Sequence, residues 1–131
     1  MKLKNIFKYL SLLILSIIMF GNLAAQSDTE DMRPGQMKRY GIEALRNGDL
    51  YTAIDYLSAY LEEKPADAKI QYKLGELYFK SRNYPAAAKC YDKAFTKKRR
   101  KFPQAQFKYA ECLKMQGKYK KALREFNIFK R

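Results

Sequence analysis

The residues of this chain that could do chemistry are few. The sequence contains no His, and its two cysteines, Cys90 and Cys112, stand far apart with no second ligand beside either of them. The chain therefore lacks the usual general base near neutral pH and the commonest metal ligand. Isolated cysteines form neither a zinc finger nor a CxxC redox site, and no phosphate-binding glycine loop or nucleophile-elbow motif occurs. We expect a protein that is not an enzyme and needs no metal or cofactor.

The first residues have the pattern of a secretory signal peptide. Residues 1–8 carry three Lys and no acid, residues 9–20 carry no charge, and small residues follow up to Gln26. Basic, apolar and small-residue regions in this order are typical of a cleaved leader. We predict a signal peptide at 1–25, a linker at 26–33, and export to the periplasm or cell envelope. The alternative is an uncleaved N-terminal membrane anchor facing the periplasm, because residues 9–27 are long enough to span a bilayer.

The densest charge is the run Lys97-Lys98-Arg99-Arg100-Lys101, in a chain with 27 Lys and Arg against 13 Asp and Glu. Consecutive cations suit phosphate, in a nucleic acid or an anionic lipid surface, although a loop is also a place where charge is easily solvated. An exported protein rarely meets nucleic acid, so we expect no nucleic-acid partner. An anionic envelope surface stays open as a ligand for this run.

The rest of the sequence repeats with intervals of 34 and 35 residues. The tracks are Gly41, Gly75 and Ala110; Ala53, Ala87 and Ala122; Leu57, Tyr91 and Phe126; and Leu50, Tyr84 and Tyr119. In each repeat two segments with helical spacing of apolar residues flank a break, at Asn47-Gly48-Asp49, Ser81-Arg82-Asn83 and Gln116-Gly117-Lys118. Asp49 and Asp67 are expected N-caps. The period predicts helical hairpins stacked into an all-α solenoid with no sheet.

These motifs resemble the tetratricopeptide repeat (TPR). The middle repeat matches best, with Leu74-Gly75, Tyr78, Tyr84, Ala87, Tyr91 and Ala94. The first has Gly41, Gly48, Ala53, Leu57 and Pro65, and the third has Tyr109-Ala110, Gly117, Tyr119, Ala122 and Phe126. The resemblance implies a TPR domain at 34–131, with three helix-turn-helix repeats at about 34–67, 68–102 and 103–131. Arg99 stands where the family has Pro, and one extra residue precedes the third repeat.

The resemblance also implies that the first helix of each repeat lines a concave groove that binds a protein or peptide. The candidate partner-binding residues are Lys38, Arg39, Arg46, Lys69, Tyr72, Lys73, Phe79, Lys80, Phe107, Lys108 and Lys114, with Ile42, Glu76, Gln104 and Glu111 among them. Cations interleaved with aromatics suit a peptide that carries acidic or free carboxylate groups. Ile42 and Gln104 replace the Asn and Lys of the family's carboxylate clamp, which argues against a receptor for chaperone tails.

The prediction is therefore a non-catalytic scaffold or adaptor of the cell envelope, within a secretion or envelope-assembly complex. The leader and repeats are similar to the N-terminal TPR region of exported envelope proteins of Bacteroidetes-type bacteria, in which OmpA-like modules follow. One alternative is that the chain is the truncated N-terminal part of such a protein. The other is a binder of anionic envelope surfaces through residues 97–101.

Two further features are open to interpretation. Cys90 and Cys112 fall on helices expected to be neighbours, so they form either a disulfide or, as we favour, two buried thiols. The last helix should leave Leu123, Phe126 and Phe129, or Ile128 in place of one of them, without a following hairpin to cover them. This predicts that the C-terminal helix docks against another copy, another protein or a further segment missing from this chain.

Overall fold

The computed structural model describes residues 32–97 and 100–130. The predicted signal peptide at 1–25, most of the predicted linker and residues 98–99 of the basic run lie outside the described residues. The compact unit Met32–Arg131 contains helices α2 (Pro34–Arg46), α3 (Leu50–Glu63), α4 (Ala68–Lys80), α5 (Tyr84–Lys97), α6 (Pro103–Met115) and α7 (Tyr119–Phe129). The described residues contain no strand, which confirms the all-α prediction. Within these ranges, no helix combines the length and the hydropathy needed to cross a membrane.

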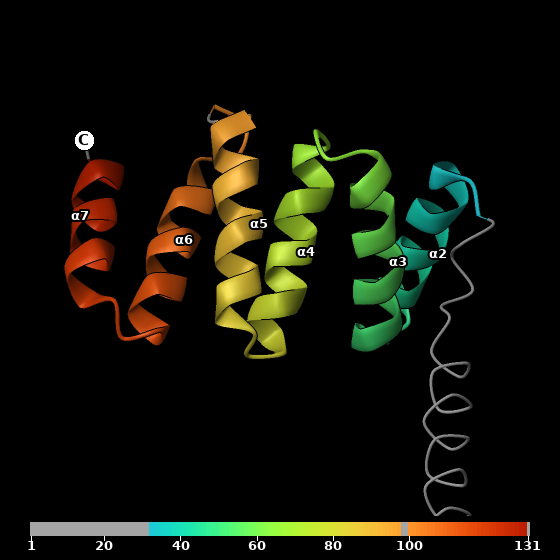
Figure 1. The fold of residues 1–131 in the computed structure, drawn as a ribbon, viewed down its shortest axis with the longest axis horizontal. Helices are drawn as coiled ribbons and strands as arrows, with labels where there is room; N and C mark the ends of the chain where they lie inside the picture. The colour runs from blue at the N-terminus through green and yellow to red at the C-terminus, as the bar shows by residue number, and fades with distance from the viewer. Residues whose placement is uncertain (1–31, 98–99, 131) are drawn as a thin grey trace, which may run out of the picture. The chain divides into compact units, whose positions relative to one another are not determined.

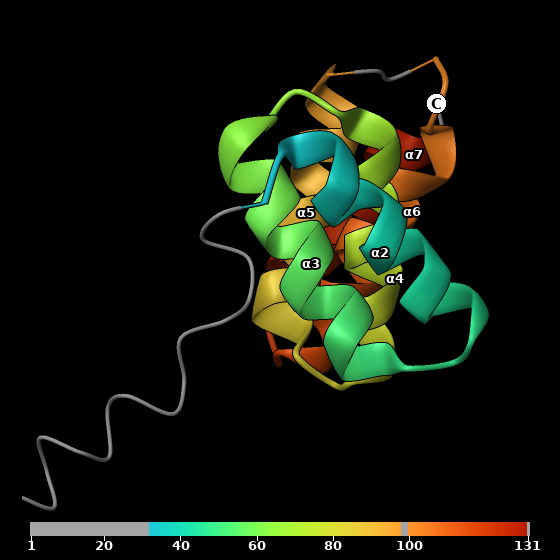
Figure 2. The same ribbon diagram turned by 90° about the vertical axis from the view of Figure 1, so that its right-hand side faces the viewer.

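The described helices form three hairpins that stack in a row (Figure 1). Helices α2 and α3, α4 and α5, and α6 and α7 pair within hairpins, while α3 contacts α4 and α5 contacts α6 across the two junctions. In the end-on view of Figure 2, α2, α4 and α6 lie on one side of the row and α3 and α5 on the other. This arrangement is the predicted solenoid, with the first helices of the hairpins on one face.

Local signals fix where the helices begin and end. Asp49 and Asp67 cap α3 and α4, and each carboxylate accepts the backbone N–H of the third residue of its helix, at 3.1 and 3.2 Å. Gly48 and Gly117 make two of the turns with φ of 78° and 73°, a conformation that side chains disfavour. In the middle hairpin Arg82 takes the same conformation, with φ of 61°. The predicted caps and breaks are therefore confirmed.

A small residue on the first helix faces a large one on the second helix of a hairpin. A Cβ atom added to Gly41 would lie 2.7 Å from the Leu57 side chain, and one added to Gly75 would lie 2.9 Å from the Tyr91 ring. Leu57 and Tyr91 are themselves almost completely buried. At these two positions glycine leaves room for the large side chain, and Ala110, another small residue, stands at the matching position of the third hairpin, so the repeat pattern is a packing pattern.

The core divides into two clusters along the row. Leu57, Ile70 and Leu77 belong to the cluster of the first hairpin and α4, which also contains Cys90, whereas Cys112 belongs to the cluster between α5 and α6. Both cysteines are buried free thiols, as favoured above, and not a disulfide. Burial raises the pKa of Cys90 to about 11 and that of Cys112 to about 12, so both stay protonated and pack as small apolar groups.

Replacing Gly75 tests this packing. The Gly75→Ala variant should be less stable than Gly35→Ala by about 1–3 kcal/mol, the usual cost of overpacking a core. Gly35 is the matched control because no atom lies within 4 Å of a Cβ added there, whereas at Gly75 three atoms of the Tyr91 ring lie within 3.2 Å. Urea unfolding followed by circular dichroism measures the difference, and equal stability of the two variants would contradict the packing argument.

Candidate functional site

The predicted partner-binding residues lie on α2, α4 and α6, and we call the side of the row that these helices form the first-helix face. The three helices carry eight Lys or Arg residues, namely Lys38, Arg39, Arg46, Lys69, Lys73, Lys80, Lys108 and Lys114, against Glu43, Glu76 and Glu111. Among the described residues only two of these cations, Lys38 and Lys108, form ion pairs. The first-helix face is therefore basic, with most of its charge uncompensated by the fold.

Helix α2 carries a hollow of about 740 Å³ on this face. Its lining residues are Gly35, Lys38, Arg39, Ile42, Glu43, Arg46 and Asn47. The Arg39 guanidinium stands 5.2 Å from the centre of the Tyr40 ring, and Arg39 and Arg46 are both exposed. Two guanidinium groups, which bind carboxylates in a forked geometry, thus border the hollow together with the Glu43 carboxylate.

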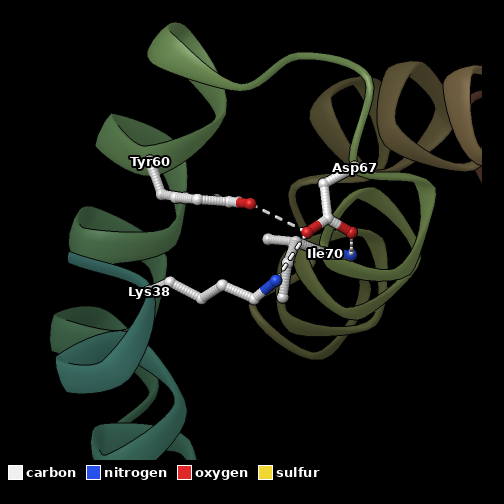
Figure 3. Close-up of polar contacts among 4 residues, drawn as sticks. All are labelled: Lys38, Tyr60, Asp67 and Ile70. Atoms are coloured by element: carbon white, nitrogen blue, oxygen red, sulfur yellow. Dashed lines mark hydrogen bonds and ion pairs between the residues drawn. The ribbon is translucent and has the colours of Figure 1, made fainter. Parts of the chain in front are cut away.

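Lys38 is engaged within the fold. Its Nζ atom donates to Asp67 Oδ2 at 2.7 Å, and the Tyr60 hydroxyl donates to the same oxygen at 2.9 Å (Figure 3). The other carboxylate oxygen of Asp67 accepts the Ile70 N–H that begins α4. One carboxylate in the loop between hairpins thus ties α2, α3 and α4 together.

The protonation states of this cluster follow from these contacts. The hydrogen bond to Asp67 raises the pKa of Lys38 above its ordinary value. Burial disfavours the charged form of Asp67, but the hydrogen bonds from Lys38, Tyr60 and the Ile70 N–H outweigh it, so the pKa of this carboxyl is lowered. Burial and the adjacent Asp67 raise the pKa of Tyr60. At neutral pH Lys38 and Asp67 are therefore charged, Tyr60 is neutral, and the three side chains form a structural contact.

The aromatic candidates are also partly used inside the fold. Tyr72 stacks on Phe102, with ring centres 5.5 Å apart and planes 19° apart, and meets the edge of Tyr91. Phe107 packs against Phe126 and Phe129 at 5.2 and 5.6 Å, and Phe79 meets Tyr84 at 5.4 Å. All three candidates are half-buried, so each offers a partner only part of its ring.

Lys108 joins α4 to α6. Its Nζ atom lies 2.9 Å from Glu111 Oε2 and 5.6 Å from the centre of the Phe79 ring. The ion pair with Glu111 raises the pKa of Lys108, and the charge of Glu76 acts in the same direction. An incoming carboxylate would have to compete with Glu111 for this ammonium group, so Lys108 is a weaker ligand than its position alone suggests.

The other predicted partner-binding cations form no ion pair among the described residues and are available to a partner. Arg39, Arg46, Lys69, Lys80 and Lys114 are exposed and Lys73 is half-buried. Of the basic run, Arg100 and Lys101 are exposed, while residues 98–99 lie outside the described ranges. The described part of the chain holds no group of three Cys, Asp or Glu residues arranged for a metal ion.

Sequence reasoning missed the structural role of Lys38 and the contribution of Tyr60 and Phe102. The signal for Asp67 was present, since it was expected to cap α4, but a cap requires only one of its two carboxylate oxygens. The second oxygen was free to bind a cation, and Lys38 is the basic residue that the hairpin geometry brings to it.

Comparison with known proteins agrees with the hairpin arrangement. Residues 40–95 and 72–129 each match the model of a family described as tetratricopeptide repeat. Among solved structures, the crystal structure of MamA protein is similar, with a TM-score of 0.66 and 22% identity. The match covers 78% of this chain and 54% of that one, so the chain spans little more than half of MamA. No curated protein sequence matches.

The Asp67→Asn variant tests the ionised cluster. Asn still caps a helix, but it removes the charge that Lys38 and Tyr60 bind, at a cost of roughly 1 kcal/mol, because Lys38 is partly exposed. The folded-state pKa of Asp67 is lowered, so this contribution is present above the unfolded value near 4 and disappears as the pH falls through the folded pKa. Urea unfolding between pH 7 and about pH 3 should show wild type and variant converging in acid.

The control for this measurement is Asp49→Asn. Asp49 caps α3 in the same way, and no ion pair involves it among the described residues. Its replacement should change stability little, since Asn and Asp are equivalent caps. If the two variants lose the same stability at neutral pH, the Lys38–Asp67 contact does not hold the first junction.

Proposed function

We propose, from the premise that this chain belongs to the tetratricopeptide-repeat family, that it is a non-catalytic adaptor which binds an acidic protein segment through the first-helix face. Stacked helical repeats generally present an extended surface to a protein partner. The fold and the family support a role in protein interaction. The acidic chemistry of the partner is our inference from this chain's own residues.

The observation that carries the proposal is the uncompensated charge of the first-helix face. Eight cations stand against three carboxylates on α2, α4 and α6, and the described structure pairs only Lys38 and Lys108. Basic residues close together repel one another, and an acidic segment lying across them relieves that repulsion while fixing its own orientation. A partner with several Asp or Glu residues, or with a free C-terminus, fits this surface.

The strongest contacts should come from α2. Arg39 and Arg46 line the hollow on this helix and neither has an acidic partner among the described residues. Lys69, Lys80 and Lys114 extend the basic surface onto α4 and α6. Lys38, Tyr72 and Phe107 support the surface from inside, because their side chains already contact other parts of the fold.

We place this adaptor outside the cytoplasm, in the cell envelope, as part of a secretion or envelope-assembly complex. The support is the basic, apolar and small-residue order of residues 1–26, which is typical of exported chains. The N-terminal region of an exported OmpA-type envelope protein, to which we compared the leader and repeats on sequence alone, would lie in the same compartment. Binding to an anionic envelope surface through residues 97–101 is the competing function.

Charge reversal on α2 tests the binding proposal. The double variant Arg39→Glu, Arg46→Glu should weaken binding of a fluorescent poly-glutamate peptide at least tenfold, about 1.4 kcal/mol, because it removes both guanidinium groups of the hollow. The matched control is Lys89→Glu, Lys93→Glu on α5, which makes the same change in net charge at exposed positions of a second helix. Fluorescence anisotropy at two salt concentrations measures both variants.

Two results would overturn the proposal. Equal loss of affinity in both double variants would mean that only the net charge of the chain matters. If replacing residues 97–101 with Gln abolished binding to vesicles of anionic lipid while the α2 variant captured the same envelope proteins as wild type, the surface-binding function would replace the adaptor function.

The location is tested by the N-terminus of the expressed protein. We expect the exported chain to begin at Gln26, with cleavage after Ala25. Intact-mass measurement of the periplasmic fraction of a producing bacterium gives the answer. A full-length chain that stays with the membrane fraction would instead establish the N-terminal anchor.

A further inference from the structure

Helix α7 carries an apolar face that no other described helix covers. Leu123 is 62% exposed and Ile128 39%, whereas Phe129, which is 36% exposed, also contacts Phe107 of α6. Phe126 is half-buried, so the expectation that it would be uncovered holds only in part. A hollow of about 400 Å³ on this face is lined by Lys120, Leu123, Arg124, Asn127 and Ile128.

The repeat register shows what kind of surface this is. Four of these lining residues stand 35 positions after Pro85, Ala88, Lys89 and Asp92, and those four residues form the α5 wall of the hollow at the α5–α6 junction. The other wall of that junction comes from α6, with Tyr109 and Leu113. Ala88 is 7% exposed in the junction, whereas its counterpart Leu123 is 62% exposed. The α7 hollow is thus half of a helix–helix junction.

Both complete junctions define the helix that fits such a wall. At the first, Leu74 and Tyr78 of α4 face α3, and the Tyr78 hydroxyl lies 3.1 Å from Ser58 Oγ. At the second, Tyr109 and Leu113 of α6 face α5. In each case two large apolar side chains four residues apart lie on one side of the incoming helix, which is the spacing of an amphipathic helix.

Charge selects among the possible occupants. Helix α7 carries Lys120, Lys121 and Arg124 against Glu125, and its exposed Arg124–Glu125 contact, at 3.9 Å, neutralises little of this charge. A second copy that continued the row would bring α2, whose three cations and single Glu43 would meet a surface of the same sign. An acidic helix would meet a surface of opposite sign, so complementarity favours it over a second copy.

We propose that the outer face of α7 docks an acidic amphipathic helix of another protein. That helix packs two large apolar side chains, four residues apart, against Leu123 and Ile128, and places its carboxylates beside Lys120 and Arg124. Docking there extends the row as α6 extends it beside α5. The site lies on a second helix of a hairpin and is distinct from the first-helix face, so either can fail without the other.

The probe is a synthetic peptide with the sequence of residues 103–116 of α6, in which Lys108→Glu and Lys114→Glu make it acidic and Cys112→Ala prevents oxidation. Binding to the full chain is followed by fluorescence anisotropy. We expect Leu123→Gln to weaken binding at least tenfold, because it removes the central apolar contact. The pair Lys120→Glu, Arg124→Glu should weaken it similarly, and a peptide that keeps both lysines should bind at least tenfold more weakly than the acidic one.

The matched control is Tyr51→Gln on α3, which removes a side chain that is 73% exposed at a distant place on the row. Peptide affinity in this variant should equal that of the wild type. Unchanged affinity of Leu123→Gln would overturn the proposal. Sedimentation showing that the chain alone self-associates, and that Leu123→Gln abolishes this association, would assign the face to a second copy and overturn it as well.

Discussion

The first two hairpins depend on the close packing of two helices at a residue without a side chain. Gly41 leaves room for Leu57 and Gly75 leaves room for Tyr91, each closer than any added Cβ atom would allow. In such a hairpin the second helix keeps an apolar side that the first helix does not cover. The next hairpin covers that side, so the row is held together by contacts between neighbouring hairpins and not by a single central core.

The hairpins were predictable from the sequence because their signals are local. Asp49, Asp67 and Gly48 act through their own backbone neighbours, and the small-to-large pairing recurs at a fixed interval that a reader of the sequence can find. The surface was less predictable, because the position that aligns Lys38, Tyr72 and Phe107 receives a different neighbour in each repeat. Lys38 meets Asp67, Tyr72 meets Phe102, and Phe107 meets Phe129. Asp67 and Phe102 lie 35 residues apart in the loops that follow the first two hairpins, whereas Phe129 lies on α7, in the same hairpin as Phe107. The residue types at these places differ, so the repeat pattern predicts no common contact.

The first-helix face therefore carries two kinds of side chain: those that contact other parts of the fold and those that stay free to contact a partner. Lys38 and Tyr72 reach the loop before the next hairpin and stabilise the stack, whereas Arg39 and Lys69, on the same two helices, stay exposed. The basic character of the face therefore survives even though Lys38 and Lys108 are paired within the fold. A partner would meet exposed cations and half-buried aromatic rings on this face.

The junction between α3 and α4 is held by polar contacts and the junction between α5 and α6 by aromatic contacts, and this difference has a mechanical consequence. Beside the apolar core, the first is clasped by an ammonium group and a hydroxyl on one carboxylate, with the Lys38 side chain 40% exposed. The second is clasped by the rings of Tyr72, Tyr91 and Phe102. Water and salt compete for the polar clasp but not for the stacked rings. Under tension along the row, we therefore expect α3 and α4 to separate before α5 and α6.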